Sequence, residues 1–151
     1  MPTSRRILGR WAFCLLTSVA SLTAGAQQLV SIKADAANLR AAPGKSGEVL
    51  WQLNRGYPLE VLERQGGWFK VSDFEGDQGW VAVSTTGTRP HHVVRSRSAR
   101  LRAGPGDEHP AVGHAVYGQV LQTEFRGADW VRVRLDKGRT AWVARDLLWG
   151  W

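Results

Sequence analysis

Few side chains in this chain of 151 residues could act as nucleophiles, acid–base catalysts or metal ligands. Cys14 is the only cysteine, and it lies in an apolar run near the start of the chain. The histidines, His91, His92, His109 and His114, have no metal-ligand spacing, and we expect them to be solvated loop residues. The carboxylates are scattered over predicted turns, and no nucleophile elbow or phosphate loop is present. The sequence therefore predicts a protein that is not an enzyme and uses no metal or cofactor.

The remaining chemistry is binding, and an internal repeat separates structural side chains from candidate binding side chains. Residues 39–44 read LRAAPG and residues 101–106 read LRAGPG, an offset of 62. A repeat of this kind has to be found first, because missing it misassigns the whole fold. The offset then holds without a gap through matched pairs: Gly56 and Gly118, Trp68 and Trp130, Val71 and Val133, Trp80 and Trp142.

Aromatic residues that occur in only one copy are the first candidates for binding. Trp51, Tyr57 and Phe74 have no aromatic counterpart in the second copy, so the shared fold does not require them. They could form an apolar platform for a glycan or peptide, since amphipathic aromatic residues anchor such contacts. The alternative is that they pack against the other module. The corresponding candidates in the second module are Tyr117, Trp149 and Trp151.

Arginines of the second module are the other candidates. Arg95 and Arg97 alternate on one predicted strand, and Arg132 and Arg134 alternate on another. If these strands are neighbours, the four side chains form one basic face, and the planar guanidinium fork suits phosphate and carboxylate groups. The alternative is that these arginines form a solvated basic surface that binds no ligand.

Residues shared by both copies are expected to serve the fold. The four matched tryptophans are predicted to be core or half-buried barrel residues rather than ligand contacts. Arg40 and Arg102 recur in the LR motif, and we interpret each as a structural arginine that joins a loop to its barrel.

The elements that must position these side chains are short strands. Extended segments recur every 8–12 residues or so with Gly- and Pro-containing turns between them, which is typical of an all-β barrel or sandwich. No window shows a sustained helical period. The sequence therefore predicts two tandem small β-barrels. The main predicted strands are 30–33, 37–40, 49–53, 59–63, 68–71 and 79–83, then 93–97, 100–102, 111–116, 120–125, 130–135 and 140–144, before a short turn at 146–148.

The combined motifs resemble those of the bacterial SH3-like (SH3b) domain family. The second copy departs from the pattern at Asp129 and Ala141, where a glycine is usual, and this is expected to change turn detail only. The resemblance implies a small, strongly bent barrel, export to the cell envelope and, for many members, peptidoglycan binding. The residues that carry it are Leu39, Arg40, Pro43, Gly44, Gly56, Gly67, Trp68, Val71, Trp80 and Val81, and then Leu101, Arg102, Pro105, Gly106, Gly118, Trp130, Val133, Trp142 and Val143.

The start of the chain has the layout of a secretory signal peptide. Arginines at positions 5, 6 and 10 precede an apolar run over 11–22, and small residues at 24–26 form a cleavage site. The run is too short to span a bilayer, which needs about 20 residues. We therefore predict a signal peptide over 1–26, with either general or twin-arginine export. The first barrel then covers 27–86, a linker 87–92 and the second barrel 93–151.

Charge differs between the two predicted modules. The whole chain has a formal net charge of +7, but residues 27–86 carry a net −1 and residues 87–151 a net +5. A basic surface favours anionic partners, and export makes nucleic acid an improbable one. Two functions remain: a binding module for peptidoglycan or another anionic envelope component, and a periplasmic adaptor that docks a protein partner. We expect an exported protein with no transmembrane segment in the mature chain. A periplasmic location is favoured, and full secretion is the alternative.

Overall fold

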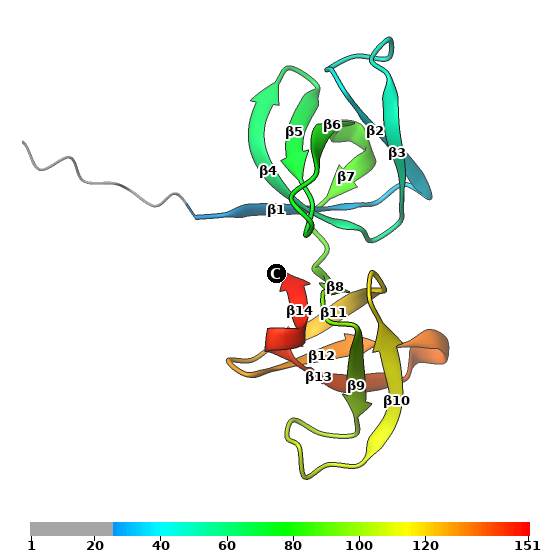
Figure 1. Cartoon of the computed structure of the whole chain (residues 1–151), viewed down its shortest axis with the longest axis vertical. Helices are drawn as coiled ribbons and strands as arrows, with labels where there is room; N and C mark the ends of the chain where they lie inside the picture. The colour runs from blue at the N-terminus through cyan, green and yellow to red at the C-terminus, as the bar shows by residue number, and fades with distance from the viewer. Residues whose placement is uncertain (1–25) are drawn as a thin grey trace, which may run out of the picture.

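A computed structural model describes residues 26–151, which form two β-barrels joined end to end (Figure 1). The predicted signal peptide therefore lies outside the described residues, apart from Ala26. Each barrel is one antiparallel sheet of seven strands. This confirms the prediction of two tandem small barrels in an all-β protein. In the described part of the chain, no helix has both the length and the apolar character needed to cross a membrane.

The first barrel is formed by the strands β1 to β7 and a single 3₁₀ turn, η1. Its strands follow the sheet order β3-β2-β6-β5-β4-β1-β7. The bounds are β1 Gln28–Ile32, β2 Ala36–Arg40, β3 Val49–Asn54, β4 Pro58–Gln65, β5 Trp68–Ser72, β6 Gln78–Ala82, η1 Val83–Thr85 and β7 Thr86–Gly87.

The second barrel repeats this order as β10-β9-β13-β12-β11-β8-β14, so the sequence repeat is a repeat of topology. Its last 3₁₀ turn, η3, leads directly into β14, the strand at the junction between the barrels in Figure 1. The bounds are β8 His91–Val94, β9 Ser98–Arg102, β10 Ala111–Val116, β11 Val120–Arg126, β12 Trp130–Arg134, η2 Asp136–Gly138, β13 Thr140–Ala144, η3 Arg145–Leu147 and β14 Leu148–Gly150.

Each barrel buries an aliphatic core of its own. Along β5, for example, Phe69 and Val71 face inward, while Trp68 lies on the other side of the strand because successive side chains alternate. The four shared tryptophans are accordingly half-buried, and the interior is filled by their neighbours. The core residues include Ile32, Leu39, Leu59, Val71 and Val81 in the first barrel, and Val94, Leu101, Val131, Val133 and Val143 in the second.

The arginine of each LR motif fastens the following loop to its barrel. Arg40 donates from Nη1 to the carbonyl oxygen of Gly47 at 2.7 Å. Arg102 donates from Nη1 to the carbonyl oxygens of Asp107 and His109, both at 2.9 Å. Both side chains thus hold the loop that carries the Pro-Gly turn, which confirms their structural role.

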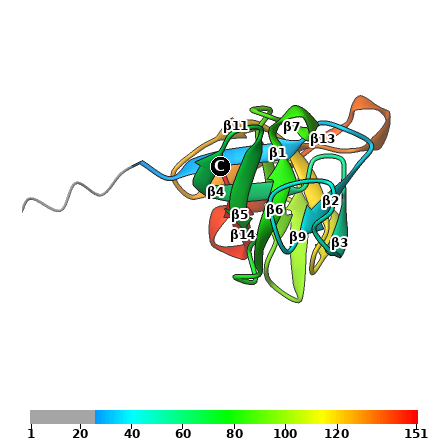
Figure 2. The same ribbon diagram turned by 90° about the horizontal axis from the view of Figure 1, so that it is seen from above.

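The connection between the barrels is shorter than predicted. Gly87 still pairs with Ser31 in the first sheet, and β8 of the second sheet already starts at His91. His92 is only 2% exposed, so the expectation of a solvated loop histidine is wrong at this position. Figure 2 looks along the long axis of the molecule, and in this view the two barrels overlap.

Candidate binding cleft beside the last strand

Three of the predicted binding residues meet where the barrels touch. Tyr57 lies just before β4, Phe74 lies in the turn between β5 and β6, and Tyr117 lies in the turn between β10 and β11. The ring centroids of Phe74 and Tyr117 are 5.4 Å apart, and those of Tyr57 and Phe74 are 6.5 Å apart. The hydroxyl group of Tyr117 also donates a hydrogen bond to the carboxylate of Glu75. These aromatic side chains therefore pack across the two modules.

Tyr57 is a neutral hydrogen-bond donor in this contact. Its hydroxyl group lies 3.3 Å from Oδ2 of Asp73 and donates to it. Burial raises the pKa of Tyr57, and the negative charge of Asp73 raises it further.

Trp51 stands apart from that contact. It lies on β3, at the edge of the first sheet, and is 57% exposed beside the exposed side chains of Val49 and Leu50. Within residues 26–151, no aromatic contact joins Trp51 to Tyr57 or Phe74. The structure thus brings Tyr57 and Phe74 together with Tyr117 and leaves Trp51 as a separate apolar site.

The four candidate arginines do not line up on neighbouring strands. β8 ends at Val94, so Arg95 and Arg97 lie in the connection to β9, and the predicted strand over 93–97 is wrong beyond Val94. Arg132 and Arg134 do lie on β12, but β11 separates β12 from β8. No single basic face can therefore form across adjacent strands in the way the sequence suggested.

Arg132 and Arg134 share one acidic partner. Nη2 of Arg134 is 2.5 Å from Oε1 of Glu124, and Nε of Arg132 is 3.5 Å from Oε2 of the same carboxylate. The guanidinium group of Arg132 also lies 5.8 Å from the ring centroid of Trp142. Glu124 offsets part of the positive charge on this face.

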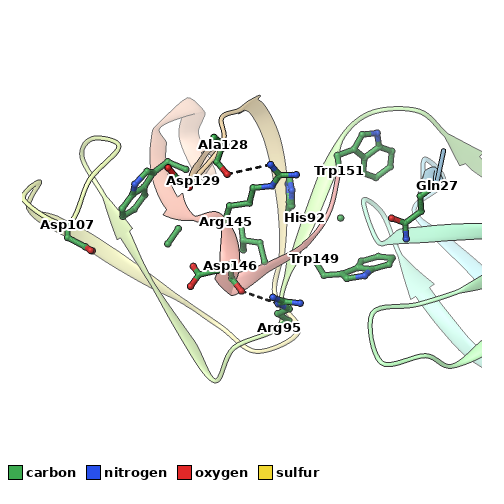
Figure 3. Close-up of a pocket in the computed structure, with 14 residues that line it drawn as sticks. Gln27, His92, Arg95, Asp107, Ala128, Asp129, Arg145, Asp146, Trp149 and Trp151 are labelled. Carbon is green, nitrogen blue, oxygen red and sulfur yellow. Dashed lines mark hydrogen bonds between the residues drawn. The ribbon is translucent and has the colours of Figure 1, made fainter. Parts of the chain in front are cut away.

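A cleft of about 730 Å³ opens beside β14 at the junction of the barrels (Figure 3). Figure 3 shows Trp149 and Trp151 next to Gln27 of the first barrel, with His92 and Arg145 on the side away from Gln27. Most of the charged side chains of the cleft come from the connection after β8, from the loop before β12 and from η3. They are Arg95, Asp129, Arg145 and Asp146, and Asp107 of the loop after β9 also lines the cleft.

The glycine between the two tryptophans lets β14 lie close to β8. In the register of this pair, Leu148 faces Val94, Trp149 faces Val93 and Gly150 faces His92. Gly150 has a φ of 141°, and a Cβ atom there would lie 2.4 Å from the carbonyl oxygen of His91. The Trp-Gly-Trp sequence thus positions both indole rings at the cleft.

The two arginine side chains of the cleft donate hydrogen bonds to backbone carbonyl groups. Arg95 donates from Nε to the carbonyl oxygen of Asp146 at 3.0 Å. Arg145 donates from Nη1 to the carbonyl oxygens of Gly127 and Ala128 at 3.4 and 3.5 Å. Asp107, which also lines the cleft, forms an ion pair with Arg102. Within the described chain, ion pairs involve none of the other charged side chains of the cleft, Arg95, Asp129, Arg145 and Asp146.

His92 is a neutral side chain at the back of the cleft. Its Nδ1 atom is hydrogen-bonded to Oγ1 of Thr123 at 2.6 Å. Burial lowers the pKa of His92 to about 4, although a hydrogen bond to the backbone of Trp151 opposes the shift. The cleft therefore presents aromatic surface, hydrogen-bond donors and acceptors, and charges of both signs, which suits binding.

Part of this cleft consists of residues that the sequence predicts as binding candidates. Trp149, Trp151 and Arg95 are such candidates, whereas Arg145 and His92 are not. The repeat contained the missing signal for His92, because the residue at the same position in the first copy is Val30. The predicted linker over 87–92 includes His92, so this histidine was not predicted at a core position of the barrel.

The family of the chain follows from comparison with known proteins. The model of the family described as bacterial SH3 domain matches residues 35–86 and again residues 97–148. These two segments make up more than half of the chain, and each falls within one barrel. The protein therefore belongs to the bacterial SH3 domain family and contains two copies of the domain.

The chain is also similar to parts of longer proteins. The chain is 23% identical over 143 residues to a putative N-acetylmuramoyl-L-alanine amidase, YrvJ, of Bacillus subtilis (strain 168), which corresponds to 87% of this chain and 27% of that protein. Among solved structures, an NlpC/P60 family protein from Bacillus cereus ATCC 10987 has 18% identity and a TM-score of 0.39, with 82% of this chain and 56% of that chain covered. The structure titled endolysin LysPBC5 CBD has 14% identity and a TM-score of 0.32, with 82% and 93% covered.

Proposed function

We propose that this protein is a non-catalytic module of the bacterial cell envelope that binds peptidoglycan through its SH3 barrels. The observation that carries the proposal is the presence of two complete bacterial SH3 domains in one chain. The similarity to a putative N-acetylmuramoyl-L-alanine amidase supports it, because such an enzyme acts on peptidoglycan. The chain spans only 27% of that relative, so the amidase activity itself is not part of the proposal.

Charge and location agree with this function. The second module carries a net +5 and contains the exposed Arg95, which lines the cleft, and the exposed Arg97. Peptidoglycan stem peptides carry carboxylate groups, which arginine binds through its planar fork. Arg132 and Arg134 add a second basic site on β12, in part offset by Glu124. The predicted signal peptide would bring the protein to the periplasm, where the polymer lies.

Co-sedimentation with purified sacculi over a salt series tests the proposal. We expect the protein to pellet with the sacculi and to be released in part as salt rises, because exposed charge contacts are screened. Replacement of Arg95, Arg97, Arg132 and Arg134 by glutamine should weaken pelleting at low salt. Replacement of the exposed first-barrel residues Lys33 and Lys45 by glutamine provides the control and should leave it unchanged. A protein that stays in the supernatant at every salt concentration would contradict the proposal.

A periplasmic adaptor is the second candidate function, and the edge strand β3 favours it. Val49, Leu50 and Trp51 are exposed on a strand whose outer side pairs with no other strand among residues 26–151. Unpaired, apolar strand edges can accept a strand from a partner protein. This function predicts no pelleting with sacculi, together with a specific protein partner whose cross-linking is lost in Trp51→Ala. Retained cross-linking in that variant would exclude β3 as the docking edge.

A further inference from the structure

We propose that the cleft beside β14 binds a glycan strand of N-acetylated sugars, with Trp149 and Trp151 as the surface on which the sugar rings stack. The inference rests on the proposed function, because it names the part of peptidoglycan that this cleft would hold.

The two tryptophans are not required by the barrel fold. The strands β7 and β14 occupy the same place in their sheets, at the end of the order and next to β1 and β8 respectively. At the positions of Trp149 and Trp151 the first barrel has Gly87 and Arg89. The same fold therefore forms without aromatic side chains there, and the pair serves something that the second barrel does alone.

The indole rings are placed where a ligand can reach them. Both tryptophans are half-buried and line the cleft, and Figure 3 shows both rings near Gln27. An indole ring combines a large apolar face with one polar N–H group. The apolar C–H face of a pyranose ring fits such a surface, while the sugar hydroxyl groups remain free for hydrogen bonds.

The polar lining has the mixed character that a sugar needs. Arg95 and Arg145 supply donors, and Asp129 and Asp146 supply acceptors. Within residues 26–151 none of these four forms an ion pair. Arg95 and Arg145 each use one guanidinium nitrogen for backbone carbonyl groups, so their other N–H groups and the two carboxylates remain available to a ligand. Hydroxyl and acetamide groups donate and accept at once and use both kinds of partner. A phosphate polymer or an anionic lipid surface would instead meet repulsion from the two carboxylates.

The size of the cleft also fits. Its volume of about 730 Å³ lies within the range of roughly 300–1,000 Å³ that is usual for ligand sites. Gln27 of the first barrel closes one side, so a bound oligosaccharide would lie along the junction between the two barrels (Figure 3).

Titration with chitotetraose, a soluble oligomer of N-acetylglucosamine, tests the inference on the whole protein. We expect saturable binding by calorimetry, together with shifts of the indole N–H signals of Trp149 and Trp151 in NMR spectra. The double variant Trp149→Gly, Trp151→Arg carries the residues of the first barrel and should lose at least tenfold in affinity. Phe125→Leu, which changes an exposed aromatic side chain on β11 that does not line the cleft, is the matched control and should bind as the unchanged protein does.

A second pair of variants covers the case in which the double variant fails to fold, which its unfolding midpoint would show. Asp129→Asn and Arg145→Gln change cleft side chains at exposed positions, and each should weaken chitotetraose binding severalfold. No binding of chitotetraose, or binding unaffected by these variants and the double variant, overturns the inference.

The proposed function and the glycan site can fail separately. Sacculus binding without chitotetraose binding would leave the proposed function intact and overturn the glycan site. Chitotetraose binding that depends on Trp149, without sacculus binding, would support the site and contradict the proposed function. A stem peptide that shifts the indole signals of Trp149 and Trp151 when chitotetraose does not would assign the cleft to peptide and overturn the glycan.

Discussion

The ring of Phe74 in the first barrel packs against the ring of Tyr117 in the second, with centroids 5.4 Å apart and planes inclined by 60°. The same turn also places Glu75 to accept a hydrogen bond from the hydroxyl group of Tyr117. A second close approach joins the barrels, since a Cβ atom at Gly56 would lie 2.8 Å from the ring of His91. The barrels are thus fixed against each other by contacts as well as by their short connection.

Phe74→Ala and Tyr117→Ala should therefore loosen the two barrels without unfolding either. An aromatic pair of this geometry contributes about 0.5–1.5 kcal/mol beyond its buried area. We expect ¹⁵N relaxation to show one shared rotational correlation time in the unchanged protein and two shorter times in the double variant. Val112→Ala, at an exposed position on β10, is the control. A shared correlation time that survives in the double variant would show that the connection alone fixes the orientation.

Arg102→Ala should destabilise the second barrel. The side chain is only 12% exposed, donates to two carbonyl oxygens and also lies 3.1 Å from Oδ1 of Asp107. Hydrogen bonds from charged groups contribute about 1.5–3 kcal/mol, so the free energy of unfolding should fall by that order. Chemical denaturation measures it, with the exposed Arg100→Ala on the same strand as control. Arg102→Lys should recover little of the lost free energy of unfolding, because lysine lacks the planar guanidinium fork. Equal losses for Arg100→Ala and Arg102→Ala would contradict the bracing role.

His92 should make stability depend on pH. Burial lowers its pKa from 6.5 to about 4, so between these values the unfolded chain binds a proton that the folded chain does not. This contribution is fully present above pH 6.5 and is lost as the pH falls toward 4, by up to about 3 kcal/mol. Denaturation at several pH values should show this loss relative to a variant with His92→Val and Thr123→Val, the residues of the first copy. Parallel pH curves for the two proteins would refute the assignment.

The sequence was sufficient for the fold because both copies carry the same turn residues in the same register. The LR motif, the Pro-Gly loop and the repeated tryptophans located the strands and the bracing arginines. The predicted strand over 93–97 was wrong at Arg95 and Arg97, because the run from Val93 to Arg97 contains neither glycine nor proline to indicate a turn. The first copy held the missing turn signal: Asp35, a frequent turn residue, stands at the position of Arg97.

The contacts between the barrels could not be predicted from local sequence patterns. Phe74 and Tyr117 lie far apart in the chain, and only the relative orientation of two complete barrels brings their rings together. The cleft has the same origin, because it needs η3, β14 and Gln27 to be in place. The unshared residues indicated where to look, but which of them meet is a property of the assembled fold.

Gly150→Ala should separate β14 from β8 and thereby dismantle the cleft. An added Cβ atom would lie 2.4 Å from the carbonyl oxygen of His91, and the φ of 141° is costly for any other residue. Gly66→Ala is the matched control, because Gly66 also has a positive φ, 56°, but no atom lies within 4 Å of the added carbon. We expect Gly66→Ala to cost about 1–2 kcal/mol of unfolding free energy and Gly150→Ala to cost more. Amide exchange at Arg95, whose backbone N–H group donates to the carbonyl oxygen of Leu147, should also accelerate in Gly150→Ala alone, and chitotetraose binding should weaken. Equal costs and unchanged exchange would mean that β14 tolerates the methyl group and that the Trp-Gly-Trp sequence does not depend on this close approach.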